Sequence, residues 1–203
     1  MKTLIVVPCM DSVPTQFCQS LSMLNKEDCA IAFQLGSLIY MARNELALKA
    51  IQFEADYIFW LDSDMTFEPD TLERLFKTME EKSADIVSGL YFRRNPPYKP
   101  VVFAKFDIVD NMPVKEEMVD IPDEVTEVGA VGFGCVLMKT QVCFDVMDKF
   151  MNMFAPIGNV GEDVAFCWRA KECGYKIWLD PNIQCGHVGH YVVARDLYEA
   201  MRK

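Results

Sequence analysis

The sequence lacks several features that mark special classes of protein. Its eight cysteines include no Cys-x-x-Cys pair, and no apolar run is long enough to cross a membrane. Basic residues are scarce: 20 Lys and Arg against 30 Asp and Glu leave a net charge of −10. We therefore do not expect a disulfide-stabilised secreted domain, a membrane-spanning protein, or a general binder of nucleic acid or anionic membranes.

The amino terminus lacks a signal-like segment. In MKTLIVVPCM the apolar stretch Leu4–Val7 ends at a proline and is too short for a signal peptide core. Scattered cysteines favour reduced thiols, so we expect a cytoplasmic protein with no transmembrane segment. A zinc site could be drawn from Cys167, Cys173, Cys185 and His187, but their spacing matches no usual zinc pattern.

What is present is the composition of a globular domain, with 51% hydrophobic and 25% charged residues. A chain of 203 residues is long enough to bury a sizeable core in one domain. Because the chain is acidic, an anionic substrate would need a local cation, either a metal ion or a buried arginine.

Apolar runs alternate with segments of helical spacing through the first half. The patterns predict strands at Leu4–Val7, Tyr57–Leu61 and Asp85–Tyr91, and helices at Leu38–Phe53 and from Pro69 onward. This alternation is typical of a doubly wound α/β fold with a mostly parallel sheet.

The second half is less regular. Its patterns predict strands near Val101–Phe106, Val128–Met138 and Lys176–Leu179, helices at Thr140–Met151, Glu162–Cys173 and Val193–Arg202, and a turn at Asp180-Pro181. Trp60 and Trp178 fall in strand-like runs and are expected in the core.

Two carboxylates, Asp62 and Asp64, follow the apolar run IFWL directly. Ligands of open α/β sheets bind outside the carboxyl ends of the strands, where these side chains would project. Two neighbouring anions favour a hard divalent cation such as Mg²⁺ or Mn²⁺. A helix cap or a solvated turn is the alternative.

The same segment, DSDMTFEPDTLE, places acidic residues at EF-hand positions and so offers a calcium alternative. Phe67 stands where the sharp turn of that loop needs glycine, and Pro69 cannot donate a strand hydrogen bond. There is no second such loop, so this pattern argues against a calcium protein.

Five ordered blocks carry a resemblance. They are Ala42-Arg43-Asn44, Tyr57 to Met65 with Pro69 beyond it, Gly132-Phe-Gly134, Gly161-Glu162-Asp163, and Asp180 followed by Cys185-Gly-His187. Together the blocks resemble GT-A fold glycosyltransferases, close to glycosyltransferase family 2. The resemblance implies a Rossmann-like, mixed and mostly parallel central sheet with helices on both faces. It also implies a nucleotide-diphosphate sugar donor over the first strands and a divalent ion bridging its diphosphate.

The resemblance also suggests roles for residues of the first half. Asp64 would be the principal metal ligand, and Asp62 would contact the ribose or the metal through water. Pro8, Cys9 and Met10 would line the base and ribose. Arg43 would face the base or the phosphates, unless it is a surface charge on its helix. The acidic residue that many relatives carry after the second strand is absent, and Gln34 to Ser37 stands there instead.

In the second half, His187 is the expected metal-binding histidine, with His190 and a merely structural histidine as alternatives. Asp163 and Glu162 would supply the base of an inverting enzyme, although acidic residues in a first helical turn also complement the helix dipole.

Two further groups have open interpretations. Gly129, Gly132 and Gly134 indicate close approach by a ligand, or a bulge. Arg93, Arg94, Tyr98 and Lys99 lie in a Pro-rich loop that could contact acceptor or diphosphate, or be solvated.

These patterns predict a single catalytic domain, residues 1–203, with a nucleotide-binding half at about 1–92 and an acceptor and metal half at about 93–203. The predicted activity is metal-dependent transfer of a sugar to an unknown hydroxyl acceptor, with inversion. A sugar-nucleotide nucleotidyltransferase and a catalytically silent nucleotide-sugar binder are the alternatives. The first would need a Gly-rich phosphate loop, which is absent after the first strand.

Overall fold

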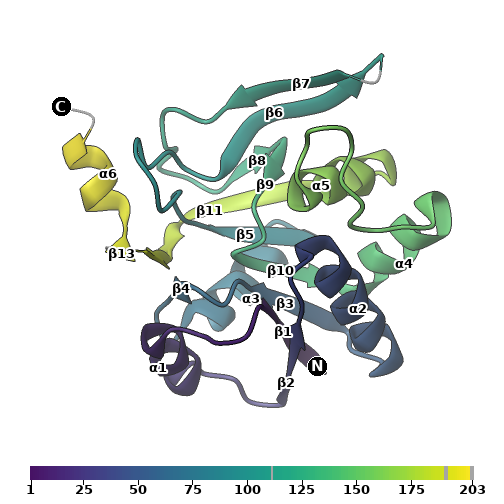
Figure 1. Cartoon of the computed structure of the whole chain (residues 1–203), viewed down its shortest axis with the longest axis horizontal. Coiled ribbons are helices and arrows are strands. Elements are labelled where there is room, and N and C mark those ends of the chain that lie inside the picture. The colour runs from purple at the N-terminus through teal and green to yellow at the C-terminus, as the bar shows by residue number, and fades with distance from the viewer. Residues whose placement is uncertain (111, 190–191, 202–203) are drawn as a thin grey trace.

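A seven-stranded mixed sheet forms the centre of the protein, seen in a computed structural model that describes residues 1–110, 112–189 and 192–201. The strand order is β2-β1-β3-β10-β5-β11-β8. The strands are β1 (Thr3–Cys9), β2 (Cys29–Leu35), β3 (Tyr57–Leu61), β5 (Ile86–Leu90), β8 (Thr126–Val128), β10 (Cys135–Lys139) and β11 (Ile177–Gln184). Figure 1 shows the sheet with the helices around it.

Five of the seven strands in this sheet run in the same direction, and β10 and β8 run in the opposite one. β1 is parallel to β2 and β3, and β11 is parallel to β5, whereas β10 runs antiparallel between β3 and β5 and β8 is antiparallel to β11. The predicted mixed, mostly parallel sheet is therefore confirmed.

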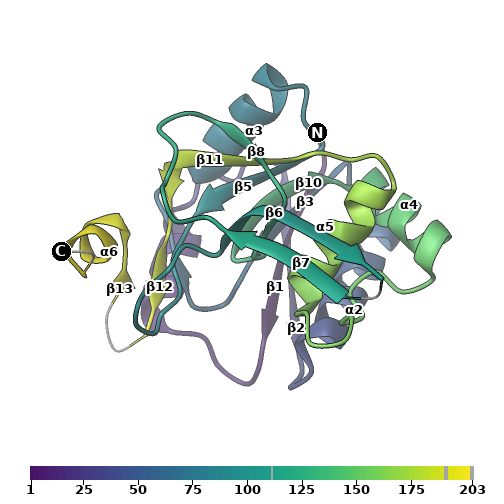
Figure 2. The ribbon, with the colours of Figure 1, turned by 90° about the horizontal axis from the view of Figure 1, so that it is seen from above.

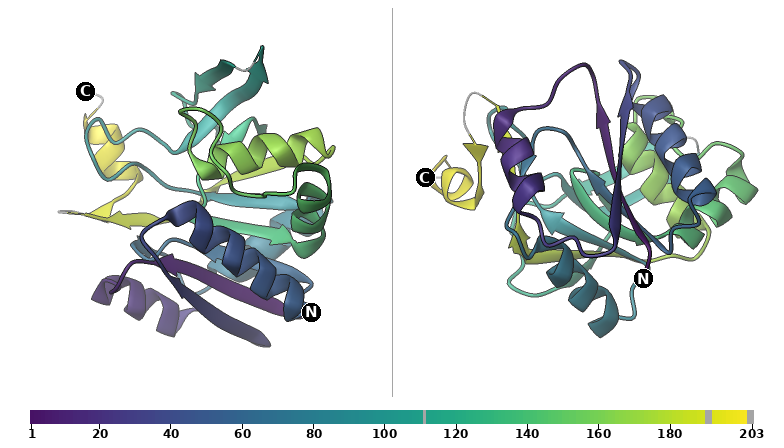
Figure 3. Two further views of the ribbon diagram at one scale, coloured as in Figure 1. Left: turned by 45° about the vertical axis from the view of Figure 1, so that its right-hand side comes forward. Right: turned by 90° about the horizontal axis from the view of Figure 1, so that it is seen from below.

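Helices cover both faces of the sheet, as predicted (Figure 3). On one face, α2 (Ile39–Gln52), α4 (Thr140–Phe150) and α5 (Glu162–Glu172) bury apolar side chains such as Leu46 and Val142 against Trp60. On the other, α1 (Thr15–Met23) and α3 (Thr71–Glu81) bury Phe17 and Leu75 against a second cluster. Alternation along β3 explains both clusters, because successive side chains of a strand point to opposite faces.

Two small three-stranded sheets complete the fold (Figure 2). One contains β4 (Met65–Thr66), β12 (Gly186–Val188) and β13 (Val192–Val193), and the other contains β6 (Val102–Val109), β7 (Met112–Glu117) and β9 (Ala130–Val131). Pairing of β12 with β4 sets His187 opposite Met65 and so brings it beside the aspartate pair. The short helix α6 (Arg195–Met201) follows β13.

Three predicted elements need correction. The single strand expected at Val128–Met138 is divided among β8, β9 and β10, which lie in two sheets. The strand that begins near Lys176 runs on to Gln184, so the predicted Asp180-Pro181 turn lies within β11, where the register shifts. The last helix begins at Arg195, two residues after the predicted start, and its predicted end at Arg202 lies outside the described residues.

The two tryptophans differ in environment. Trp60 is fully buried as expected, whereas Trp178 is only partly buried against the second cluster. Across the described ranges, none of the helices combines the length and the apolarity that a membrane crossing requires.

Candidate active site

An open cleft of about 420 Å³ lies at the carboxyl ends of the central strands. It is lined by the predicted site residues Pro8, Cys9, Met10, Arg43, Asp62, Asp64, Glu162, Asp163 and His187, together with Gly36, Ser37, Ile39, Ser63 and Arg94. The fold thus brings residues from both halves of the chain around one space. A larger groove of about 790 Å³ lies at the amino ends of β1 and β3, where Met1 and Tyr57 line it. It contains none of the predicted site residues.

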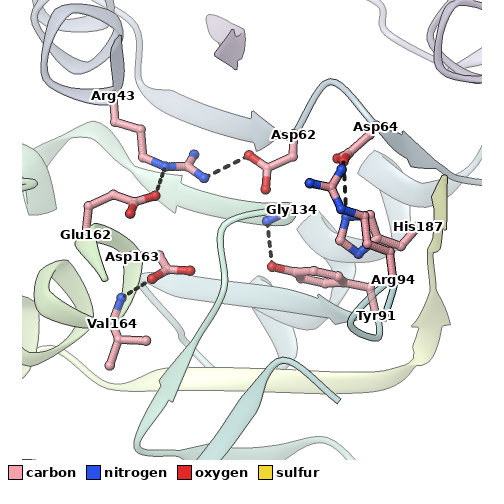
Figure 4. A network of polar contacts seen from close by, with 10 residues as sticks. All are labelled: Arg43, Asp62, Asp64, Tyr91, Arg94, Gly134, Glu162, Asp163, Val164 and His187. Atoms are coloured by element: carbon pink, nitrogen blue, oxygen red, sulfur yellow. Dashed lines mark hydrogen bonds and ion pairs between the residues drawn. The ribbon is translucent and has the colours of Figure 1, made fainter. Parts of the chain in front are cut away.

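Arg43 is buried beneath the cleft, with 2% of its surface exposed, so the surface-charge alternative is wrong. Its Nη2 donates to Asp62 Oδ1 at 2.8 Å and its Nε donates to Glu162 Oε1 at 3.1 Å (Figure 4). The guanidinium also lies over the rings of Trp60 and Phe133. Burial favours loss of the proton, but the charges of Asp62 and Glu162 outweigh it and raise the pKa of Arg43. This arginine therefore joins the aspartate loop to the start of α5.

A second ionic cluster is centred on Asp64. Arg94 Nη1 donates to Asp64 Oδ2 at 2.6 Å, and His187 Nε2 lies 3.2 Å from the same oxygen. His187 Nδ1 lies 2.8 Å from the carbonyl oxygen of Phe92, which fixes the ring. Burial alone would raise the pKa of Asp64, but the hydrogen bond and charge of His187, followed by Arg94, lower it. Burial alone would lower the pKa of His187, and Asp64 reverses that shift.

The donor set for a metal ion is small. Among the residues that the structure describes, no three His, Cys, Asp or Glu side chains are grouped to hold a metal. Asp64 and His187 are the two predicted ligands that meet, whereas Asp62 is bonded to Arg43. His190 lies outside the described residues. Such a pair offers one carboxylate and one imidazole to a divalent cation, which would take its other ligands from water or substrate phosphates.

The two acidic residues at the start of α5 are in different states. Glu162 is paired with Arg43, whereas Asp163 has no ion pair within the described part of the chain. Asp163 Oδ1 accepts the N–H of Val164 at 2.7 Å. Burial, reinforced by the charge of Glu162, raises the pKa of Asp163 to about 6. Asp163 is therefore a carboxylate that can gain and lose a proton near neutral pH.

The glycines of the 129–134 segment have a cause other than a ligand. A Cβ atom at Gly129 would lie 2.3 Å from the backbone nitrogen of Phe106. One at Gly132 would lie 2.0 Å from the hydroxyl oxygen of Tyr91. The close approach is thus made by the protein itself, and Tyr91 is a residue near the site that sequence reasoning missed.

The Pro-rich loop is held at both ends. Arg93 and Lys99 both pair with Glu117 at the end of β7, at 3.3 and 2.6 Å. Arg94, between them, reaches Asp64 instead. The loop is thus more than a solvated connection, because it delivers one cation to the cleft.

The comparisons with known proteins agree with this geometry. Residues 42–137 match the family described as glycosyl transferase family 2, a segment that includes Arg43, Asp62, Asp64 and Arg94. The chain is a GT-A glycosyltransferase similar to family 2.

Two solved structures share the fold of this glycosyltransferase. The crystal structure of A197 from STIV superposes with a TM-score of 0.66 at 18% identity, covering 97% of this chain and 91% of that one. The crystal structure of GalNAc-T7 with UDP, GalNAc and Mn²⁺ gives a TM-score of 0.63 at 12% identity, covering 93% of this chain and 44% of that one. No curated protein sequence matches the chain.

The family match ends at residue 137, before three of the predicted functional residues of the glycosyltransferase. Glu162, Asp163 and His187 are brought to the matched segment by the fold, through the Arg43–Glu162 and Asp64–His187 contacts. These contacts join residues inside and beyond the matched segment into one site.

Proposed function

We propose that the protein transfers a sugar from a nucleotide-diphosphate sugar to a hydroxyl acceptor, with the help of a divalent cation and with inversion at the anomeric carbon. One observation carries the proposal. The paired side chains of Asp64 and His187 line one cleft at the carboxyl ends of the strands together with Asp163, a carboxylate of raised pKa that has no ion pair among the described residues.

The nucleotide would bind over the ends of β1 and β2, where Pro8, Cys9, Gly36 and Ser37 line the cleft. Asp64 and His187 would hold Mn²⁺ or Mg²⁺ next to the diphosphate. The ion would supply positive charge to the departing diphosphate, which the acidic chain otherwise lacks. Arg94 occupies Asp64 here, so it must move aside when a cation binds that oxygen.

Asp163 would act as the base. As the acceptor oxygen forms its bond to the anomeric carbon, its proton passes to the Asp163 carboxylate, and the bond from that carbon to the diphosphate oxygen breaks. Glu162 would hold its position through Arg43 and take no proton, because its carboxylate is already engaged in that ion pair. A single displacement of this kind inverts the anomeric configuration.

We also propose that the protein acts in the cytoplasm. All eight cysteines are unpaired, in keeping with the reducing cytoplasm.

The test is donor turnover by the purified protein. A panel of nucleotide sugars is incubated with Mn²⁺ or with EDTA, with and without sugar acceptors, and release of nucleoside diphosphate is followed. We expect turnover with Mn²⁺ and its loss with EDTA. Equal turnover in EDTA would refute metal dependence, and donor binding without turnover would favour the silent binder. The anomeric configuration of the product decides between inversion and retention.

A further inference from the structure

Tyr91 lies just after β5, against His187 of the cleft, with 4% of its surface exposed. Two glycines enclose its ring. A Cβ atom at Gly132 would lie 2.0 Å from Oη of Tyr91, and a Cβ atom at Gly134 would lie 2.8 Å from its Cζ. The side chain of Tyr91 thus fills the space that any larger residue at either glycine would need.

Tyr91 is connected to the aspartate loop by its hydroxyl group. The N–H of Gly134 donates to Tyr91 Oη at 3.2 Å, and the carbonyl of Gly134 accepts the N–H of Asp62 at 3.2 Å. The aspartate that begins the predicted metal motif is therefore connected to Tyr91 by two hydrogen bonds through one residue, Gly134.

The ring of Tyr91 also contacts the histidine on the other side of the cleft. It meets the ring of His187 edge-on, with centroids 5.7 Å apart and planes at 75°. Figure 4 shows Tyr91 between His187 on one side and Asp163 on the other. One side chain thus contacts two segments, around residues 134 and 187, that are far apart in the sequence.

The hydroxyl group is kept in its neutral form. Burial, together with the charges of Asp62 and Asp163, raises the pKa of Tyr91 well above its usual value. A neutral phenol can accept the Gly134 N–H and adds no further negative charge to an already acidic site.

We propose that Tyr91 is a positioning residue for sugar transfer, setting the spacing between the aspartate loop and His187. Its hydroxyl acts through Gly134 on Asp62, and its ring acts on His187 directly. The inference rests on the proposed function, because the spacing affects sugar transfer only if Asp64 and His187 hold a cation between them.

The test compares Tyr91→Phe with Tyr175→Phe. Both variants lose one hydrogen-bonded hydroxyl, but that of Tyr175 donates to Asp145 at 2.5 Å, away from the cleft. Loss of a group bonded directly to a metal ligand weakens metal affinity about 10- to 100-fold, and the Tyr91 hydroxyl acts one residue further away, through Gly134, so we expect a loss below that range. We expect that loss of Mn²⁺ affinity, measured by electron paramagnetic resonance of free Mn²⁺, in Tyr91→Phe and wild-type affinity in Tyr175→Phe.

A second measurement needs no metal. Exchange of the Asp62 and Gly134 amide protons, followed by NMR in metal-free protein, should be faster in Tyr91→Phe and unchanged in Tyr175→Phe. Unchanged exchange would overturn the proposal, and so would faster exchange with wild-type Mn²⁺ affinity. A wild-type protein that binds no Mn²⁺ would refute the metal dependence in the proposed function, while exchange would still test the hydrogen bond to Tyr91.

The glycine contact supplies an independent check on folding. Gly132→Ala should lower the melting temperature, because its methyl group meets Tyr91 Oη first. Adding Tyr91→Phe removes that oxygen and should restore part of the loss. A double variant less stable than Gly132→Ala would contradict the packing on which the proposal depends.

Discussion

Replacing Asp163 with Asn tests the base and its electrostatic origin together. In the folded protein the pKa of Asp163 is about 6, against an ordinary value of 3.8. Below both values the carboxyl is protonated in the folded and unfolded states, and its charge costs no stability. As the pH rises between them the unfolded chain loses its proton first, so stability falls, and above about 6 the loss is complete.

The magnitude follows from the size of that shift. About two pKa units correspond to roughly 3 kcal/mol of unfolding free energy. An asparagine has no proton to lose, and its Oδ1 can still accept the Val164 N–H that Asp163 accepts at 2.7 Å. Asp163→Asn should therefore be more stable than wild type at pH 8, by up to about 3 kcal/mol, with no such gain at pH 3.

Activity should change in the opposite direction. Loss of a general base costs about 10² to 10⁴ in rate, so Asp163→Asn should be nearly inactive while binding the donor normally. The kcat of the wild type should rise with pH through about 6, as the Asp163 carboxylate forms.

Glu162→Gln is the matched control. It removes one of the two carboxylates that neutralise the buried Arg43, so it should lower stability at pH 8. Urea denaturation at pH 3 and pH 8, with transfer rates at pH 8, measures all of these effects. The reasoning is refuted if Asp163→Asn shows no pH-dependent gain, or transfers sugar at the wild-type rate.

Three other substitutions test the remaining contacts. Asp64→Ala should abolish the Mn²⁺-dependent rise in melting temperature with nucleoside diphosphate, and an undiminished rise would disprove its role as a ligand. Arg94→Ala should strengthen Mn²⁺ binding by up to about fivefold, the range of an exposed ion pair, while Arg93→Ala should not; equal calorimetric affinities would show that Arg94 does not compete with the cation. Arg43→Ala should lower the free energy of unfolding by about 3–5 kcal/mol, because two carboxylates lose their counter-charge, whereas the half-exposed Arg74→Ala should cost much less by urea denaturation.

Local patterns were sufficient to predict the sheet class and the carboxylate loop. The run Tyr57–Leu61 is buried because it is continuously apolar, and Asp62 follows it at the mouth of a cleft. By contrast, α1 has a single buried residue, Phe17, and no side-chain cap, so the sequence offered little to predict it from.

The contacts of the site depended on tertiary structure. Arg43 and Glu162 are 119 residues apart, and an arginine on a helix gives no local sign that it will be buried between two carboxylates. The cause of the glycines at 132 and 134 was equally hidden, because Tyr91 approaches them from a different strand. The roles of the site residues stay predictions.

The antiparallel strand β10 has a consequence for how the chain folds. It separates β3 from β5, so these two strands never touch, although both precede residue 92. Synthesis from the amino terminus thus produces the outer neighbours first and the strand between them more than forty residues later. Because a buried strand edge must find its hydrogen-bond partners, the nascent first half has to wait for Cys135–Lys139 before its sheet can close. Closure over such a sequence distance is slow, and until then the exposed edges of β3 and β5 are open to pairing with other chains.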